Sequence, residues 1–144
     1  MGFFRRLFGG AKHPKQMSGE QPRVFARLAG PGSFEFDIVG ESFRQGTLGR
    51  ICGGRCHDGH RKEVEAVLVH EDGNPKDNMA LAVLIGEELV GYLDRKGARQ
   101  FRARMREAGA AGVPALCAAM IVGGWDRGRG NTGHFGVKLD LPVE

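Results

Sequence analysis

The segment Val64-Glu-Ala-Val-Leu-Val-His-Glu-Asp-Gly-Asn-Pro-Lys-Asp-Asn-Met-Ala-Leu-Ala-Val-Leu-Ile85 holds two apolar runs around a turn. Residues 64–71 and 79–85 have the length of strands and are rich in β-branched and other apolar residues. The residues between them are mostly Gly, Pro, Asn and Asp, and Pro75 has no N–H to donate to a strand ladder. The segment therefore predicts a β-hairpin.

Shorter runs on either side of the hairpin extend this pattern. Residues 34–39, 88–92, 114–122 and 135–141 are also expected to be strands, separated by glycine-containing turns. Residues 42–51 have apolar side chains at helical spacing and end at Gly53, and residues 95–108 follow a candidate N-cap at Asp94. Five to six short strands with two helices predict a mostly β fold, either an α+β arrangement or a small barrel.

The length of 144 residues fits one domain with a tail. Residues 1–32 carry six basic residues, one acidic residue and three prolines, which predicts a flexible basic N-terminal tail ahead of a domain at residues 33–144. Residues 3–8 place apolar side chains beside two arginines, but so short an element anchors weakly, and we do not expect membrane contact there. An odd number of cysteines, three, favours a reducing, cytoplasmic location.

The charge of the chain favours an acidic partner. Lys and Arg outnumber Asp and Glu by 21 to 17, and the isoelectric point is about 9.3. Four arginines recur at spacings of three and four in the helix expected at residues 95–108, namely Arg95, Arg99, Arg102 and Arg106. Such a stripe is typical of a solvated helix face and also of a surface that contacts nucleic acid. Both interpretations remain open at this point.

Four segments occur in one order along the chain: Ile38-Val-Gly-Glu-Ser-Phe43, Glu71-Asp-Gly-Asn-Pro-Lys-Asp-Asn-Met-Ala80, Val90-Gly-Tyr-Leu93, and Gly123-Gly124 followed by Gly136-Val-Lys-Leu-Asp-Leu141. Together they resemble the HIRAN domain, whose signature is Asn-Pro-x-Asp-x-x-Ala-x-x-Val followed by Val-Gly-Tyr/His-Leu. The similarity covers about residues 34 to 142.

The resemblance implies a fold and a function. The fold is an OB-like β-barrel of about six strands with two α-helices. The function is that of a non-catalytic DNA-binding module that grips single-stranded DNA or 3' DNA ends in DNA repair or replication-fork processing, alongside a helicase or another repair protein. A barrel face of this kind offers aromatic rings for bases and basic groups for phosphates.

The resemblance also assigns roles to particular residues. Phe43 and Tyr92 would stack on bases, Asp77 would accept a hydrogen bond from the terminal hydroxyl, and Arg95 would meet a phosphate. Lys76 stands where many members have an aromatic residue, and it adds a phosphate contact, as do Arg99 and Arg102 of the basic stripe. Each role has a structural alternative, since Phe43 fits a core position, Tyr92 fits a helix contact, and Asn74 and Asp77 are typical turn residues.

The sequence also contains four residues of the types that bind zinc, Cys52, Cys56, His57 and His60. The four residues lie within nine positions, which is tighter than the paired spacing of structural zinc sites, so we expect a polar loop and no cofactor. A zinc-binding accessory domain for a helicase-like hydrolase and a protein-interaction adaptor are the alternative functions. The sequence contains no P-loop, nucleophile elbow or His-Glu-x-x-His motif, and we expect no enzymatic activity.

Overall fold

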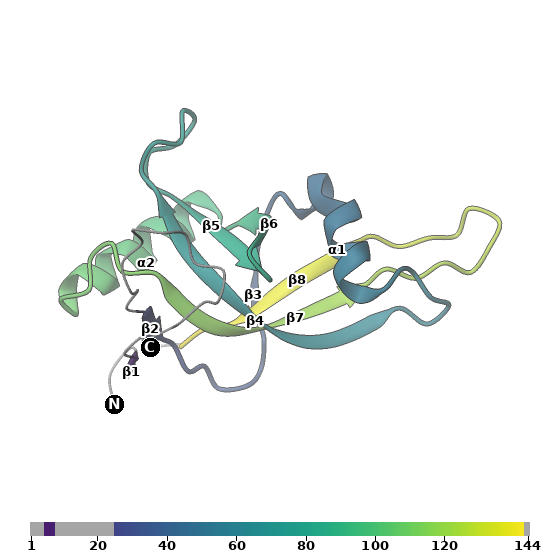
Figure 1. Ribbon diagram of the computed structural model, residues 1–144, viewed down its shortest axis with the longest axis horizontal. Helices are drawn as coiled ribbons and strands as arrows, with labels where there is room; N and C mark the ends of the chain where they lie inside the picture. The colour runs from purple at the N-terminus through teal and green to yellow at the C-terminus, as the bar shows by residue number, and fades with distance from the viewer. Residues whose placement is uncertain (1–4, 8–24, 143–144) are drawn as a thin grey trace, which may run out of the picture.

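The computed structural model describes residues 5–7 and 25–142, and it is a curled β-sheet with helices at its two ends (Figure 1). The strands are β1 (Arg5–Leu7), β2 (Phe25–Arg27), β3 (Phe36–Asp37), β4 (His60–Glu71), β5 (Ala80–Ile85), β6 (Glu88–Tyr92), β7 (Ala115–Gly123) and β8 (Phe135–Asp140). The helices are the 3-10 turn η1 (Glu41–Arg44), α1 (Gln45–Cys52) and α2 (Arg95–Glu107). The predicted mostly β fold with two α-helices is confirmed.

The sheet follows an antiparallel path from β8 through β7, β4 and β5 to β6. On its other side β8 pairs with β3. Val39, just after β3, exchanges two backbone hydrogen bonds with Tyr92 at the end of β6, of 2.8 and 2.9 Å. This bridge joins the two ends of the path, so six strands form a barrel-like ring that is consistent with the predicted OB-like barrel.

Gly91 explains how β6 and the segment after β3 approach one another. A Cβ atom at this position would lie 2.7 Å from the Val39 carbonyl oxygen and 2.7 Å from the Cδ1 atom of Ile38. Any larger residue would therefore separate the two segments. The Val90-Gly-Tyr-Leu93 motif thus has a structural role, because its glycine permits the bridge that its tyrosine makes.

Both predicted helices form, with local signals at their ends. Asp94 caps α2, since its Oδ1 accepts the Gly97 N–H at 2.7 Å. The helix buries Ala98, Phe101 and Met105 against the sheet. The first predicted helix begins as the 3-10 turn η1, continues as α1, and ends at Gly53 in the left-handed conformation.

The packed part of the chain includes residues that the sequence places in the tail. Phe25–Arg27 form β2, which pairs in parallel with the start of β7, and the side chains of Ala26 and Leu28 are buried in the core. Arg5–Leu7 form β1, which pairs with β2. The rest of the predicted tail up to residue 24, including residues 3, 4 and 8, lies outside the described residues. Across the ranges that are described, no helix is long and apolar enough to cross a membrane.

Candidate nucleic-acid interface

The turn between β4 and β5 is held by its own polar side chains. Asn74 Oδ1 accepts the N–H groups of Lys76 at 2.8 Å and Asp77 at 3.2 Å. Asp77 Oδ1 accepts the Met79 N–H at 3.0 Å. These are the local side-chain to backbone bonds that Asn and Asp form in turns. Both residues therefore stabilise the turn, as their residue types suggested.

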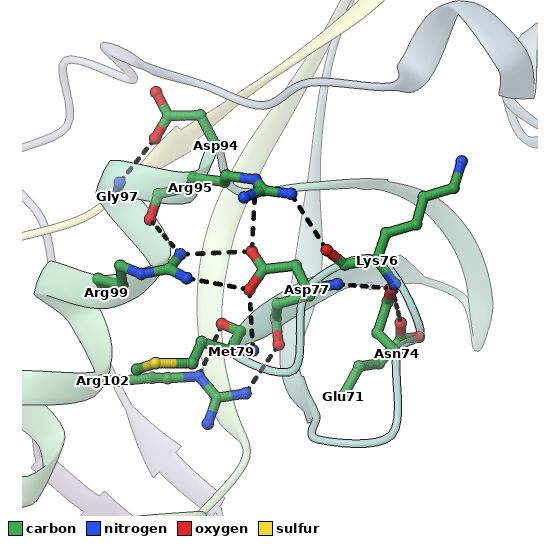
Figure 2. A network of polar contacts seen from close by, with 11 residues as sticks. Glu71, Asn74, Lys76, Asp77, Met79, Asp94, Arg95, Gly97, Arg99 and Arg102 are labelled. Atoms are coloured by element: carbon green, nitrogen blue, oxygen red, sulfur yellow. Dashed lines mark hydrogen bonds and ion pairs between the residues drawn. The ribbon is translucent and has the colours of Figure 1, made fainter.

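Two arginines of α2 reach across to this turn, as Figure 2 shows. The Arg99 guanidinium donates to both oxygens of the Asp77 carboxylate, at 3.2 and 3.3 Å. Arg95 Nε lies 3.8 Å from Asp77 Oδ2, and its Nη2 donates to the Lys76 carbonyl at 3.1 Å. The Asp77 side chain is 11% exposed, whereas those of Arg99 and Arg95 are 44% and 69% exposed. The carboxylate thus lies beneath the two guanidinium groups.

The surroundings of Asp77 favour its charged form. The Met79 N–H and the Arg99 guanidinium hold the pKa of the Asp77 carboxyl below its usual range. At neutral pH this carboxylate is therefore an anion that faces Arg99 and Arg95. Lys76, Arg95 and Arg99 are exposed cations near it, alongside the acids Glu71, Asp72 and Asp94 of the same segments.

Arg102 lies on the same helical stripe but makes a different set of contacts. Its guanidinium donates to the carbonyl oxygens of Met79 at 2.8 Å and Ala80 at 2.9 Å, and it lies 2.9 Å from Asp72 Oδ1. The side chain is 12% exposed. These contacts fasten the helix to the start of β5. Arg102 therefore has a structural role, and it lacks the exposure that its predicted phosphate contact requires.

Tyr92 connects the turn to the other side of the candidate interface. Its hydroxyl donates to Glu71 Oε1 at 2.9 Å, and the same oxygen accepts from the Asn74 amide at 3.0 Å. Burial, followed by the contact with Glu71, raises the pKa of Tyr92. The ring is half-buried and lies next to Gly40, which precedes η1. Part of the aromatic surface therefore stays accessible.

Phe43 is the most exposed large apolar side chain in the described part of the molecule, at 85% exposure. It lies on η1, which is held to the barrel on one side by the Val39–Tyr92 bridge and on the other by Gln45, whose amide exchanges two hydrogen bonds with the Phe135 backbone, of 2.7 and 3.0 Å. The alternative that Phe43 is a core residue is wrong. Arg44 next to it is also exposed, and its charge acts on the Tyr92 hydroxyl. Arg44 was missed because it belongs to no periodic stripe and no motif.

The four zinc candidates do not converge. Cys56 Sγ lies 3.7 Å from His60 Nε2, but that nitrogen also lies 2.9 Å from the Gly54 carbonyl oxygen. His57 instead contacts Asp58 at 3.0 Å. Throughout the described residues, no group of three or more His, Cys, Asp or Glu side chains is arranged to hold a metal ion.

Two grooves lie elsewhere on the surface. One, of about 490 Å³, lies along the opposite side of α2 between Phe36, Phe101 and Leu141, and the other, of about 530 Å³, lies over β7 between Phe34, Arg61 and Lys138. Neither of these two grooves contains Phe43, Asp77 or Tyr92.

Comparison with family models, with curated proteins and with solved structures gives no match for this chain. The HIRAN resemblance therefore stays a prediction.

Proposed function

We propose that this chain is a non-catalytic module that binds single-stranded DNA across the surface formed by η1, Tyr92, the β4–β5 turn and the side chains of Arg95 and Arg99 on α2. The single observation that carries this proposal is the 85% exposure of Phe43 on a backbone that the barrel holds in place. Exposing a phenylalanine to water forgoes the free energy of burial, which is recovered when a base stacks on the ring.

The charges around this ring suit a nucleic-acid strand. Arg44 is next to Phe43 in the chain, and Tyr92 is linked through Glu71 and Asn74 to the turn that carries Lys76. Arg95 and Arg99 contact this same turn. Stacking surfaces flanked by cations are what proteins use to bind single strands without reading sequence. The net charge of +4 adds long-range attraction for a polyanion. A role in DNA repair or at replication forks follows from the HIRAN resemblance.

The test is a fluorescence anisotropy titration of a labelled oligothymidine at several salt concentrations. The logarithm of the association constant should fall linearly with the logarithm of salt concentration, with a slope of about 0.7 per phosphate contacted. Phe43→Ala should weaken binding about tenfold, the effect of losing one base stack, while Phe43→Trp should retain it. Loss of affinity in both variants, or in neither, would contradict stacking at Phe43.

Absence of binding even at low salt would refute the proposal. In that case the protein-interaction adaptor becomes the leading function, because it requires no phosphate contact. The zinc-binding alternative is tested separately by metal analysis of protein purified without a metal-affinity tag.

A further inference from the structure

The Asp77 carboxylate has little capacity left for a ligand. Its Oδ1 already accepts from the Met79 N–H and from Arg99, and its Oδ2 accepts from Arg99 and faces Arg95 at 3.8 Å. A carboxylate has about four acceptor positions, and Figure 2 shows donors from the turn and from α2 filling most of them. With 11% of the side chain exposed, solvent reaches little of the group.

A terminal hydroxyl is a poor competitor for these positions. To donate to Asp77 it would have to displace a guanidinium, replacing a charge-assisted pair of bonds by a single bond from a neutral donor. The displaced Arg99 would also lose the partner that holds it against the turn. The role that the resemblance gives to Asp77, acceptance of a hydrogen bond from a 3' hydroxyl, therefore conflicts with the contacts of the residue.

The outward-facing groups of the same cluster are cations. Lys76 is exposed and its side chain extends away from the carboxylate in Figure 2, while Arg95 is 69% exposed. The other acids of these segments are engaged in contacts of the fold: Asp94 Oδ1 accepts the Gly97 N–H, Glu71 Oε1 accepts from Tyr92 and Asn74, and Asp72 pairs with Arg102. Because these carboxylates already have partners within the protein, the group best matched to the outward-facing cations is a phosphate.

We propose that Lys76, Arg95 and Arg99 form a phosphate site and that Asp77 is its positioning residue, holding the two arginines in place without contacting the ligand. This inference rests on the proposed binding of single-stranded DNA and specifies which chemical group of the strand the site takes. It predicts that a phosphate at the 3' end is tolerated, which is the opposite of what capture of a free 3' hydroxyl requires.

The test compares three labelled oligonucleotides of one sequence that carry a free 3' hydroxyl, a 3' phosphate or a 5' phosphate. The protein should bind the 3'-phosphorylated strand at least as tightly as the strand with the free hydroxyl. A weakening of about tenfold or more by the 3' phosphate, the size expected when a carboxylate meets a second anion in place of a hydrogen-bond donor, would overturn the phosphate site. Failure of all three to bind at low salt would refute the proposed function itself.

Variants separate a positioning role from the other roles of Asp77. Asp77→Asn should weaken binding of all three strands by a similar factor, because the arginines lose their anchor. A purely electrostatic role would instead strengthen binding, since a negative charge is removed, and a hydroxyl-binding role would weaken only the strand with the free 3' end. Either of those two results contradicts the proposal.

The cations are tested with a matched control in the same helical turn. Arg95→Gln and Lys76→Gln should each lower the affinity for all three strands and flatten the salt dependence by about 0.7 in logarithmic slope, the value for one lost phosphate contact. Lys96→Gln removes the same charge from an exposed neighbour outside the cluster and should leave that slope within error of wild type. Equal effects of the Arg95 and Lys96 variants would contradict a localised site.

Discussion

Replacement of Arg102 by methionine should destabilise the protein without removing its DNA contacts. Methionine keeps an unbranched stem that packs against the same neighbours, so the change isolates the guanidinium. The guanidinium donates to the carbonyls of Met79 and Ala80 from a side chain that is 12% exposed, and it pairs with Asp72. These contacts connect α2 to the end of the β4–β5 turn.

The size of the effect follows from these three contacts. Each of the two bonds to a carbonyl contributes about 1–1.5 kcal/mol net, since the donor is charged but the bonds are only partly buried. The Asp72 side chain is 76% exposed. Its ion pair with Arg102 therefore adds a few tenths of a kcal/mol at most. The free energy of unfolding should fall by about 3 kcal/mol, or about 10 °C in Tm for a domain of this size.

Urea denaturation followed by circular dichroism measures this loss. Arg106→Met is the matched control, because Arg106 lies one turn further along the same stripe and is exposed. The control should change the free energy of unfolding by less than about 0.5 kcal/mol, as surface substitutions usually do. If the Arg102 variant is equally stable, or if it keeps its stability but loses DNA affinity, the assignment of Arg102 to the fold is refuted.

Three further predictions concern the barrel and its surroundings. Gly91→Ala should destabilise the protein by about 1–3 kcal/mol in urea denaturation, since its Cβ would lie 2.7 Å from the Val39 carbonyl oxygen, and an unchanged stability would contradict that close approach. Asp140→Ala should cost about 1–3 kcal/mol in the same assay, because this buried carboxylate accepts the N–H groups of residues 32 and 34 and its removal leaves both donors without that acceptor. For His70, burial and then the charge of Arg102 lower its pKa, so the unfolded chain binds the proton more readily and stability should fall as pH drops below about 6.5. His70→Gln should flatten this pH dependence, and a wild-type slope in the variant would assign the effect to other groups.

The parts of the fold that the sequence predicts well are those whose signals are local. The turn at residues 72–78 lies between two apolar runs, and its hairpin forms with β4 and β5 paired along six positions. Asp94 precedes an amphipathic segment, and it caps α2. Each of these features depends on residues within a few positions of one another, so composition and spacing suffice to find them.

The features that the sequence misses depend on contacts between distant residues. The parallel pairing of β2 with β7 brings residues 25–28 into the core and joins positions about 90 apart. The short basic segment around β2, with prolines nearby, contains no local pattern that predicts this pairing. The exposure of Phe43 is of the same kind, because apolar spacing in residues 42–51 suggests a buried face. The 3-10 turn rotates Phe43 away from the face that buries Leu48 in α1.

The arginine stripe of α2 shows why spacing alone cannot assign function. Arg95, Arg99 and Arg102 lie on one helical face and contact successive residues of one segment. Arg95 and Arg99 contact Lys76 and Asp77 of the turn and stay exposed, whereas Arg102 bonds to the carbonyls of Met79 and Ala80 and is nearly buried. One helix thus fastens both the turn and the start of β5. Stability and ligand binding should therefore depend on different arginines of the same stripe. Loss of Arg102 should lower the free energy of unfolding, whereas loss of Arg95 should reduce the salt dependence of binding.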